Sequence, residues 1–231
     1  MDTVNGGEVG MLMELLQNRN QLTLPYALLL VVSYVALVLV MMPVHELAHA
    51  WAANKLGDNT AYWHGRLRFN PFAHLDPWGT AMIFLFGFGF AKPVPVNPRN
   101  FRNPKQGMAL TALAGPVSNL LMAAASVGLF RILCALPLSI AVLQYAEIVL
   151  IGVFASVNVG LAIFNLIPVP PLDGSKILAL VVPSRWIYSM ERYSRYITWG
   201  IMALLFSGYL DVPLSNARLF VMGFLLRIFG F

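Results

Sequence analysis

"MMPVHELAHAWAANKL", residues 41–56, places two histidines and a glutamate at the end of an apolar run that begins at Leu24. A helix over residues 24–56 would be about 50 Å long, at ~1.5 Å per residue, and so exceeds the ~30 Å hydrocarbon core of a bilayer. Its last turns must therefore leave the core. Pro43 lies just before the histidines and predicts a kink there.

The composition of the chain agrees with a membrane location. Of its 231 residues, 58% are hydrophobic and only 11% are charged, against about 25% charged residues in soluble domains. The mean hydropathy is +0.71. No linker or repeat divides the sequence, so we expect one integral membrane domain over residues 1–231. The acidic start of the chain lacks the pattern of a removable signal peptide, so we expect the first span to be retained.

Further apolar segments predict an all-α polytopic membrane protein. Two long helices are expected over residues 108–133 and 144–167. Residues 196–210 and 217–231 are shorter, and we expect them to form a helical hairpin around "DVPLSN". The lone cysteine, Cys134, rules out an intrachain disulfide and fits a small buried side chain.

The region between the first two long helices has a different character. Residues 61–80 mix aromatic residues, glycines, prolines and charges, which is typical of an irregular or hairpin segment at the membrane interface. Residues 81–90 are apolar but too short to span, so we expect a re-entrant loop or a membrane-dipped β-hairpin. A proline-rich basic loop follows.

Loop charge predicts the orientation of the helices. One basic residue, Arg19, precedes the first span, whereas seven lie between that span and residue 108. They are Lys55, Arg66, Arg68, Lys92, Arg99, Arg102 and Lys105. Because short basic loops stay in the cytoplasm, we expect a multi-pass protein of the cell membrane whose histidine end faces the cytoplasm. We interpret the net charge of +5 as this topology signal rather than as a nucleic-acid site.

The histidine segment has the spacing of a metal site. His45 and His49 are four residues apart, so a helix presents both rings on one face, where they can bind a single zinc ion. Glu46 is turned about 100° from His45 and can instead hold and deprotonate the attacking water. The alternative is a helix end with two interfacial histidines and a solvated glutamate, although such groups are costly at membrane depth without a shared partner.

A catalytic zinc ion needs a third protein ligand. Asp173 follows the third long helix, and the expected topology returns it to the same membrane face as His45 and His49. The alternative for Asp173 is a simple Asp-Gly turn. His64 and His74 compete as third ligands, but their aromatic and basic surroundings favour loop or interface positions.

Several separated motifs resemble the site-2 protease family of intramembrane zinc metalloproteases. "HELAHA" resembles the zinc motif of that family, "NLIPVPPLDG" its Asn-to-Asp-Gly motif, and "AGPVSNLLMA" the helix between them. "AKPVPVNPRNFRNP" is similar to the basic loop of compact members without a PDZ domain. The resemblance implies an intramembrane protease with one catalytic zinc ion. It also implies that His45, His49 and Asp173 are the ligands and that Glu46 is the general base.

Buried asparagines are the other polar groups of the predicted helices. Asn119, Asn158 and Asn165 fit hydrogen bonding between helices, which small neighbours such as Gly115 favour. Asn165 precedes a proline-rich stretch where the helix would unwind, and its amide could bind the backbone of an unfolded substrate. The family resemblance favours this substrate-binding role for Asn165 and Asn119. Ser175 stands where many relatives have a second glycine, which leaves the expected ligands unchanged.

The expected partners are the lipid bilayer and transmembrane protein substrates. As an alternative function, the chain would be a non-catalytic, zinc-containing membrane scaffold that binds transmembrane partners. A metal transporter is a third possibility, but it would need polar groups along a path through several spans, and the sequence offers almost none.

Overall fold

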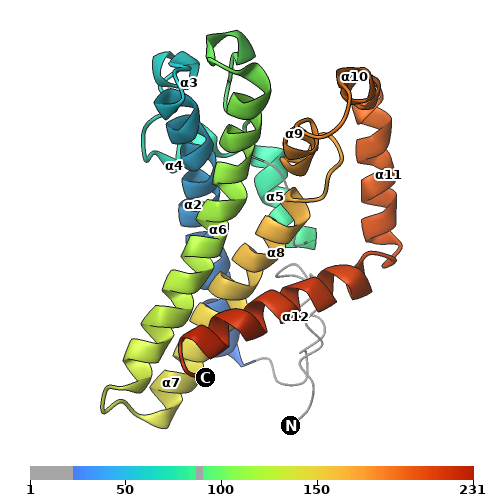
Figure 1. Ribbon diagram of the computed structural model, residues 1–231. Helices are drawn as coiled ribbons and strands as arrows, with labels where there is room; N and C mark the ends of the chain where they lie inside the picture. The colour runs from blue at the N-terminus through green and yellow to red at the C-terminus, as the bar shows by residue number, and fades with distance from the viewer. Residues whose placement is uncertain (1–22, 87–90) are drawn as a thin grey trace.

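The computed structural model describes residues 23–86 and 91–231 and is helical, without β-strands, over these residues (Figure 1). Three helices in the described ranges are long and apolar enough to cross a membrane. They are α2 (Leu24–Lys55), α6 (Pro104–Cys134) and a composite helix over Ile140–Asn165. The predicted all-α membrane fold is therefore confirmed. The expectation about the N-terminus and part of the expected re-entrant segment lie outside the described residues.

Helix α2 carries the histidine motif and has defined signals at both ends. Its N-cap is Thr23, whose side chain accepts a hydrogen bond from the Tyr26 N–H, and a proline lies in its first turn. At the C-terminus the Gly57 N–H bonds to the Asn54 carbonyl and the Asp58 N–H to the Ala53 carbonyl. This Schellman arrangement needs a left-handed residue, and Gly57 has φ = 106°. The helix is continuous through Pro43.

The third long helix is π-helical in its middle part. It consists of α7 (Ile140–Glu147), the π-helical segment η3 (Ile148–Ala155) and α8 (Ser156–Asn165). Ser139 caps its start by accepting a hydrogen bond from the Val142 N–H. The predicted helix over residues 144–167 is thus confirmed, with both ends shifted towards the N-terminus. A π-helix within an apolar span was not predicted, because its hydrophobic pattern does not differ from that of an α-helix.

Helices α2, α6 and α8 pack into a bundle that forms the core. Helix α6 begins with Asn103 as its N-cap and Pro104 in its first turn, and it runs antiparallel to α2 (Figure 1). One apolar cluster includes Leu37, Met41 and Val153, from α2 and η3. A second cluster joins α6, the end of η3, α8 and α12, and consists of Ala123, Val127, Ala155, Val159 and Met222. The bundle therefore holds the histidine end of α2 against α6.

The segment between α2 and α6 forms short helices rather than a hairpin. These are α3 (Thr60–Trp63), α4 (Pro71–His74), α5 (Pro77–Phe86) and the 3₁₀-helix η2 (Pro98–Asn100). The expectation of a β-hairpin is wrong for the described part of this segment, where one isolated bridge joins Leu75 and Ala91. The reason is local, because Asn70 and Asp76 accept hydrogen bonds from the first N–H groups of α4 and α5.

Asp58 ties the end of α2 to the basic loop. Its side chain is fully buried and accepts hydrogen bonds from the Thr60 hydroxyl, the Asn97 N–H and the Asn100 amide. Burial alone would raise the pKa of Asp58, but these hydrogen bonds outweigh burial and lower the pKa below its usual value. The carboxylate is therefore ionised at neutral pH and fixes residues 97–100 beside the end of α2.

The C-terminal third contains four more helices. They are α9 (Gly174–Leu178), α10 (Ser184–Arg192), α11 (Ser194–Phe206) and α12 (Asp211–Ile228). The two expected C-terminal helices are present, but "DVPLSN" lies inside α12 rather than between them. The turn comes earlier, at Gly208 (φ = 76°), and Pro213 is tolerated in the first turn of α12. Helix α12 crosses the bundle and packs on α8 (Figure 1).

Candidate metal centre

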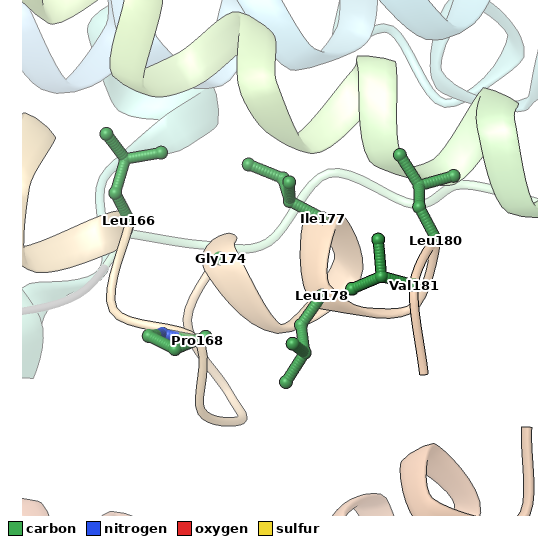
Figure 2. A pocket seen from close by; sticks show the side chains of 7 residues that line it. All are labelled: Leu166, Pro168, Gly174, Ile177, Leu178, Leu180 and Val181. Atoms are coloured by element: carbon green, nitrogen blue, oxygen red, sulfur yellow. The ribbon is translucent and has the colours of Figure 1, made fainter. Parts of the chain in front are cut away.

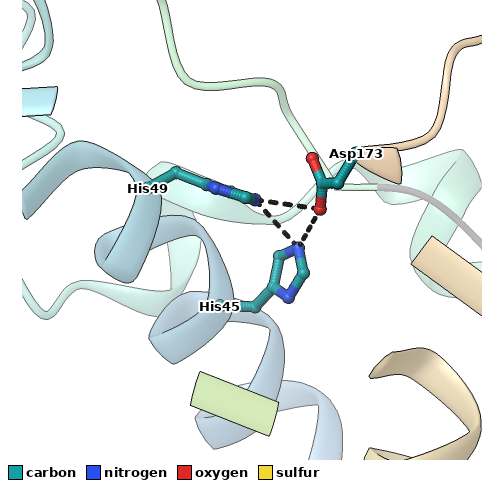
Figure 3. A group of neighbouring side chains, drawn as sticks. All are labelled: His45, His49 and Asp173. Carbon is teal, nitrogen blue, oxygen red and sulfur yellow. Dashed lines mark hydrogen bonds and ion pairs between the residues drawn. The ribbon is translucent and has the colours of Figure 1, made fainter. Parts of the chain in front are cut away.

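Three potential ligand atoms converge where α2, α6 and the loop before α9 meet. His45 and His49 project from one face of α2, and Asp173 lies directly before α9 (Figure 3). The two Nε2 atoms are 3.1 Å apart. Asp173 Oδ2 lies 3.4 Å from His45 Nε2 and 3.3 Å from His49 Nε2. Residues separated by more than 120 positions thus form one cluster, as expected from the topology.

The triangle of ligand atoms fits a tetrahedral metal ion. With metal–ligand bonds of about 2.0–2.2 Å, two ligand atoms of a tetrahedral zinc site are about 3.3–3.5 Å apart. The two separations from Asp173, 3.3 and 3.4 Å, match this spacing, and the 3.1 Å between the two Nε2 atoms is slightly shorter. Two imidazoles and one carboxylate are also a common donor set of catalytic zinc sites, which leave a fourth position open. The arrangement can therefore hold a metal ion.

The Asp173 carboxylate is ionised, as a metal ligand must be. Burial alone would raise its pKa, but hydrogen bonds and charge from His45 and His49 outweigh burial and lower the pKa of Asp173 to about 2. The side chain is only 21% exposed, so the two imidazoles are its main compensation. A divalent cation among the three residues would supply the same compensation.

The backbone of α6 fixes the orientation of His49. His49 Nδ1 lies 2.7 Å from the Thr111 carbonyl oxygen and donates its hydrogen bond there, because a carbonyl can only accept. The Nδ1 atom therefore carries a proton, which leaves Nε2 as the atom that a metal ion shared with Asp173 would bind. Metal-bound histidines usually have such a partner on their second nitrogen.

Two glycines allow the elements of the cluster to come together. A Cβ on Gly115 would overlap the imidazole rings of both histidines, so only glycine lets α6 approach α2 at this level. A Cβ on Gly174 would meet the backbone carbonyl oxygens of Leu166 and Ile167. Gly174 thus lets the Asp173 turn fold back on the end of α8.

The Asp173 turn is held by local hydrogen bonds. The Ser175 hydroxyl donates to the Leu172 carbonyl, at 2.7 Å, and the Lys176 N–H donates to the Asp173 carbonyl. Ser175 is almost fully buried. The serine that departs from the family pattern therefore contributes a hydrogen bond to the turn that carries the carboxylate.

Glu46 and His74 lie near the cluster without belonging to it. Glu46 is partly buried, and its charge interacts with His45, His49 and Asp173. It also interacts with His74, whose ring is fully buried and whose Nε2 bonds to the Arg68 carbonyl. His64 is exposed and bonds to the Thr60 carbonyl. Neither alternative third ligand joins the group of three in the described residues.

The three asparagines occupy different environments. Asn165 is partly buried at the last position of α8. Asn158 is fully buried, and its amide nitrogen contacts Met41 Sδ and donates to the Phe154 carbonyl. Asn119 is 1% exposed, and neither of its amide atoms has a hydrogen-bond partner within residues 23–86 and 91–231. The expected hydrogen bonding between helices is thus absent for Asn119.

An apolar pocket of about 330 Å³ borders the Asp173 turn (Figure 2). It lies between the end of α8 and the segment of α9 that follows Asp173. Its lining consists of Leu166, Pro168, Gly174, Ile177, Leu178, Leu180 and Val181. Because Gly174 is the neighbour of Asp173, the pocket lies beside the metal cluster.

Sequence reasoning missed the contacts that hold the ligands in place. The Thr111 carbonyl could not be found, since every residue has a carbonyl and the helix register decides which one meets His49. Gly115 was identified only as a small residue that favours helix packing. The prolines of the "PVPPLDG" stretch gave no sign of an adjoining pocket.

Comparison with known proteins gives a consistent result. The family described as "Peptidase family M50" matches residues 133–208, a range that includes Asp173 but not the histidines of α2. The protein of Bacillus subtilis (strain 168) named "Putative zinc metalloprotease YwhC" is 42% identical over 198 residues, which cover 83% of this chain and 90% of that protein. A second relative is the protein of Mycolicibacterium smegmatis named "Putative zinc metalloprotease Rip2". It is 28% identical over 144 residues, covering 59% of this chain and 52% of its own length. No solved structure matches.

Proposed function

The chain belongs to peptidase family M50, and we propose that it is an intramembrane zinc protease that cuts membrane-anchored proteins in or near their transmembrane segments. In this proposal His45, His49 and Asp173 hold one zinc ion and Glu46 is the general base. Both relatives are named as zinc metalloproteases, and the three long apolar helices support a multi-pass membrane protein.

One observation carries the proposal. Two imidazoles from a membrane-length helix and a carboxylate from a distant turn lie 3.1 to 3.4 Å apart, close to the spacing that a tetrahedral zinc ion requires. Without a metal ion, only the two imidazoles would compensate the Asp173 carboxylate, and such polar groups are costly in an apolar bundle.

Glu46 is proposed to transfer a proton from the attacking water to the leaving amine. When bound, a zinc ion supplies a Lewis acid that polarises the substrate carbonyl and makes water easier to deprotonate. Glu46 lies one position along α2 from His45, and its carboxylate takes the proton of the attacking water. The same carboxylate then passes this proton to the leaving amine as the peptide bond breaks.

Asn165 is proposed to bind the substrate backbone. A helical substrate keeps its carbonyls in hydrogen bonds, so the segment to be cut must unwind and find new partners. Asn165 ends α8 and is partly exposed, which supports contact between its amide and an unwound peptide. Burial of Asn119 argues against direct contact with substrate, and a different role is proposed below.

The segment that follows Ala91 offers a second contact for the substrate. Residues 61–86 are helical or turn-like, so an edge strand from that region is not available. Residues 92–97 instead have no regular secondary structure, and the neighbouring Ala91 packs against the cluster that contains Met41 and Met42. We propose that this segment pairs with the unwound substrate. Replacing Val94 by proline should raise KM, and an unchanged KM would exclude the pairing.

The charge distribution supports a cytoplasmic metal site. The loop between α2 and α6 carries five of the seven basic residues counted above, Lys55 ends α2, and Lys105 lies in the first turn of α6. A cysteine at position 99, in a Cys134→Ala background, should react with a membrane-impermeant thiol reagent only after intact cells are permeabilised. Labelling in intact cells would place the metal site on the outer side instead.

The Glu46→Gln variant tests catalysis directly. It should keep its zinc and its fold but lose cleavage of a model membrane-anchored substrate by a factor of about 10² to 10⁴. Glu147→Gln is the matched control, because Glu147 is exposed at the far end of the third long helix. The rival function, a non-catalytic membrane scaffold, predicts that Glu46→Gln has no effect in any assay. Normal turnover by this variant would exclude the proposed mechanism.

A further inference from the structure

The environment of His45 differs from that of His49 in one respect. His45 Nε2 faces Asp173 and His49, so a metal ion would bind at Nε2 and the ring proton would be on Nδ1. That Nδ1 atom is buried and has no hydrogen-bond partner among the described residues. His49 has the Thr111 carbonyl in the equivalent place. A buried N–H without an acceptor is unfavourable, so His45 needs a partner that the direct contacts do not supply.

The register of α2 and α6 identifies a residue that could accept the hydrogen bond of His45 Nδ1–H. His49 meets Thr111, and both histidines meet Gly115. Because α2 and α6 run antiparallel, a step of four residues towards the N-terminus of α2 matches a step of four residues towards the C-terminus of α6. The next pair in this register is Met41 and Asn119. Asn119 therefore lies on the same face of α6 as Gly115, one turn deeper in the bundle.

The directions of the side chains bring His45 and Asn119 together. Side chains lean towards the N-terminus of their own helix, and the two helices run in opposite directions. His45 thus leans towards the level of Asn119, and Asn119 leans towards the level of Gly115. The His45 ring lies against α6, because its Cε1 atom, which is bonded to Nδ1, borders the position that a Gly115 Cβ would occupy.

Like His45 Nδ1, the Asn119 amide lacks a hydrogen-bond partner among the described residues. Its amide oxygen and nitrogen are both buried and both without partners, in a bundle where such a side chain is costly. We propose that Asn119 is a positioning residue of the metal site: its Oδ1 atom accepts the hydrogen bond of His45 Nδ1–H through one ordered water molecule. This fixes the tautomer and ring orientation of His45 as the Thr111 carbonyl fixes those of His49. The inference rests on the proposed role of His45 as a zinc ligand.

Zinc affinity of the full chain in detergent tests this role without any measurement of cleavage. Affinity is measured by competition with a chromophoric chelator for the wild type and three variants. Asn119→Leu keeps the size of the side chain but has no acceptor, and it should bind zinc about 10- to 100-fold more weakly. Asn119→Asp keeps the acceptor oxygen and should remain within about threefold of the wild type.

Asn158→Leu is the matched control. Asn158 contacts Met41 and so lies in the same layer, but it comes from α8 and its amide donates to the Phe154 carbonyl of the same composite helix. The Asn158→Leu substitution should leave the zinc affinity of the protein unchanged. Equal weakening by Asn158→Leu and Asn119→Leu would overturn the inference, because it would indicate a general packing effect. Should Asn119→Leu fail to fold, Asn119→Ala serves for the same comparison.

Two further outcomes separate this inference from the proposed function. Wild-type zinc affinity in Asn119→Leu, with or without a raised KM for substrate, would overturn the positioning role alone, and a raised KM would indicate substrate contact. Failure of the wild type itself to bind zinc would overturn the proposed metalloprotease function, and the inference with it.

Discussion

At the residue scale, the metal cluster depends on how closely α6 approaches the histidines of α2. Thr111 contributes only its carbonyl oxygen, and Gly115 contributes only the absence of a side chain. Both contributions place the Nε2 atoms of His45 and His49 within reach of Asp173. The geometry of the site is thus as sensitive to a neighbour on α6 as to the ligands themselves.

Gly115→Ala should disturb the site without removing a ligand. The added methyl group overlaps both imidazoles, and such overpacking typically costs about 1–3 kcal/mol. If the rings move to relieve it, zinc affinity should fall by about tenfold or more. Gly200→Ala on α11 is the matched control, because nothing lies within 4 Å of its added Cβ. Equal zinc affinity of the Gly115→Ala variant and the wild type would show that the close approach is not required.

The convergence of His45, His49 and Asp173 was predictable, whereas the contacts that support it were not. The spacing of His45 and His49 is enough to place both rings on one helix face, and Asp173 followed from counting spans. The hydrogen bond of His49 to the Thr111 carbonyl could not be predicted from residue types, because every residue has a backbone carbonyl. Substrate contact was predicted for Asn119, but its burial and its place in the register became visible only with α2 and α6 packed together.

At the element scale, long apolar helices were predicted well and short polar ones poorly. Residues 24–55 and 104–134 form helices because unbroken apolar runs at a membrane have no alternative that satisfies their backbone groups. Residues 60–86 form three short helices. Their composition of glycines, prolines and aromatic residues fits a hairpin equally well, and the capping hydrogen bonds of Asn70 and Asp76 decide between the two.

Asp58 should make the attachment of the basic loop dependent on pH. Its pKa in the folded chain is lower than in an unfolded chain, so its contribution to stability is complete above about pH 4. That contribution is lost as the pH falls through the folded-state pKa. Asp58→Asn should destabilise the protein at pH 7 by about 1.5–3 kcal/mol, the usual value of a hydrogen bond to a charged group. Thermal unfolding at pH 7 and pH 3 measures this.

The difference between wild type and Asp58→Asn should shrink at pH 3, since the Asp58 carboxyl of the unfolded wild-type chain is largely protonated there and proton uptake favours the unfolded state. Asp211→Asn is a suitable control because Asp211 is exposed at the start of α12. A difference that stays the same at both pH values would contradict the role given to the Asp58 charge.

The pocket beside Asp173 should influence which peptides are cut. Its apolar lining and its position next to Gly174 suit an apolar side chain close to the scissile bond. Val181→Trp should fill it and lower kcat/KM about tenfold for substrates with a large apolar residue there, with a smaller loss for alanine. Val212→Trp, at an exposed position on α12, serves as control. Equal losses for large and small residues would rule out this use of the pocket.

At the scale of the whole molecule, the fold brings together two segments that are far apart in the sequence. Helices α6 and α8 lead the chain across the bundle and back, and only the return brings Asp173 to the histidine end of α2 (Figure 1). The order of apolar spans is visible in the sequence, so this meeting could be predicted. The depth of the site within the bundle could not, because it depends on the close packing at Gly115.

Zinc content of purified protein tests the central claim that these two segments share one ion. The wild type and Glu46→Gln should each contain one zinc ion per chain, and Asp173→Ala should lose it or bind it at least about tenfold more weakly. Asp211→Ala, which removes an acidic side chain far from the histidines in sequence, should retain the metal. Full zinc occupancy with unchanged affinity in Asp173→Ala would contradict the account.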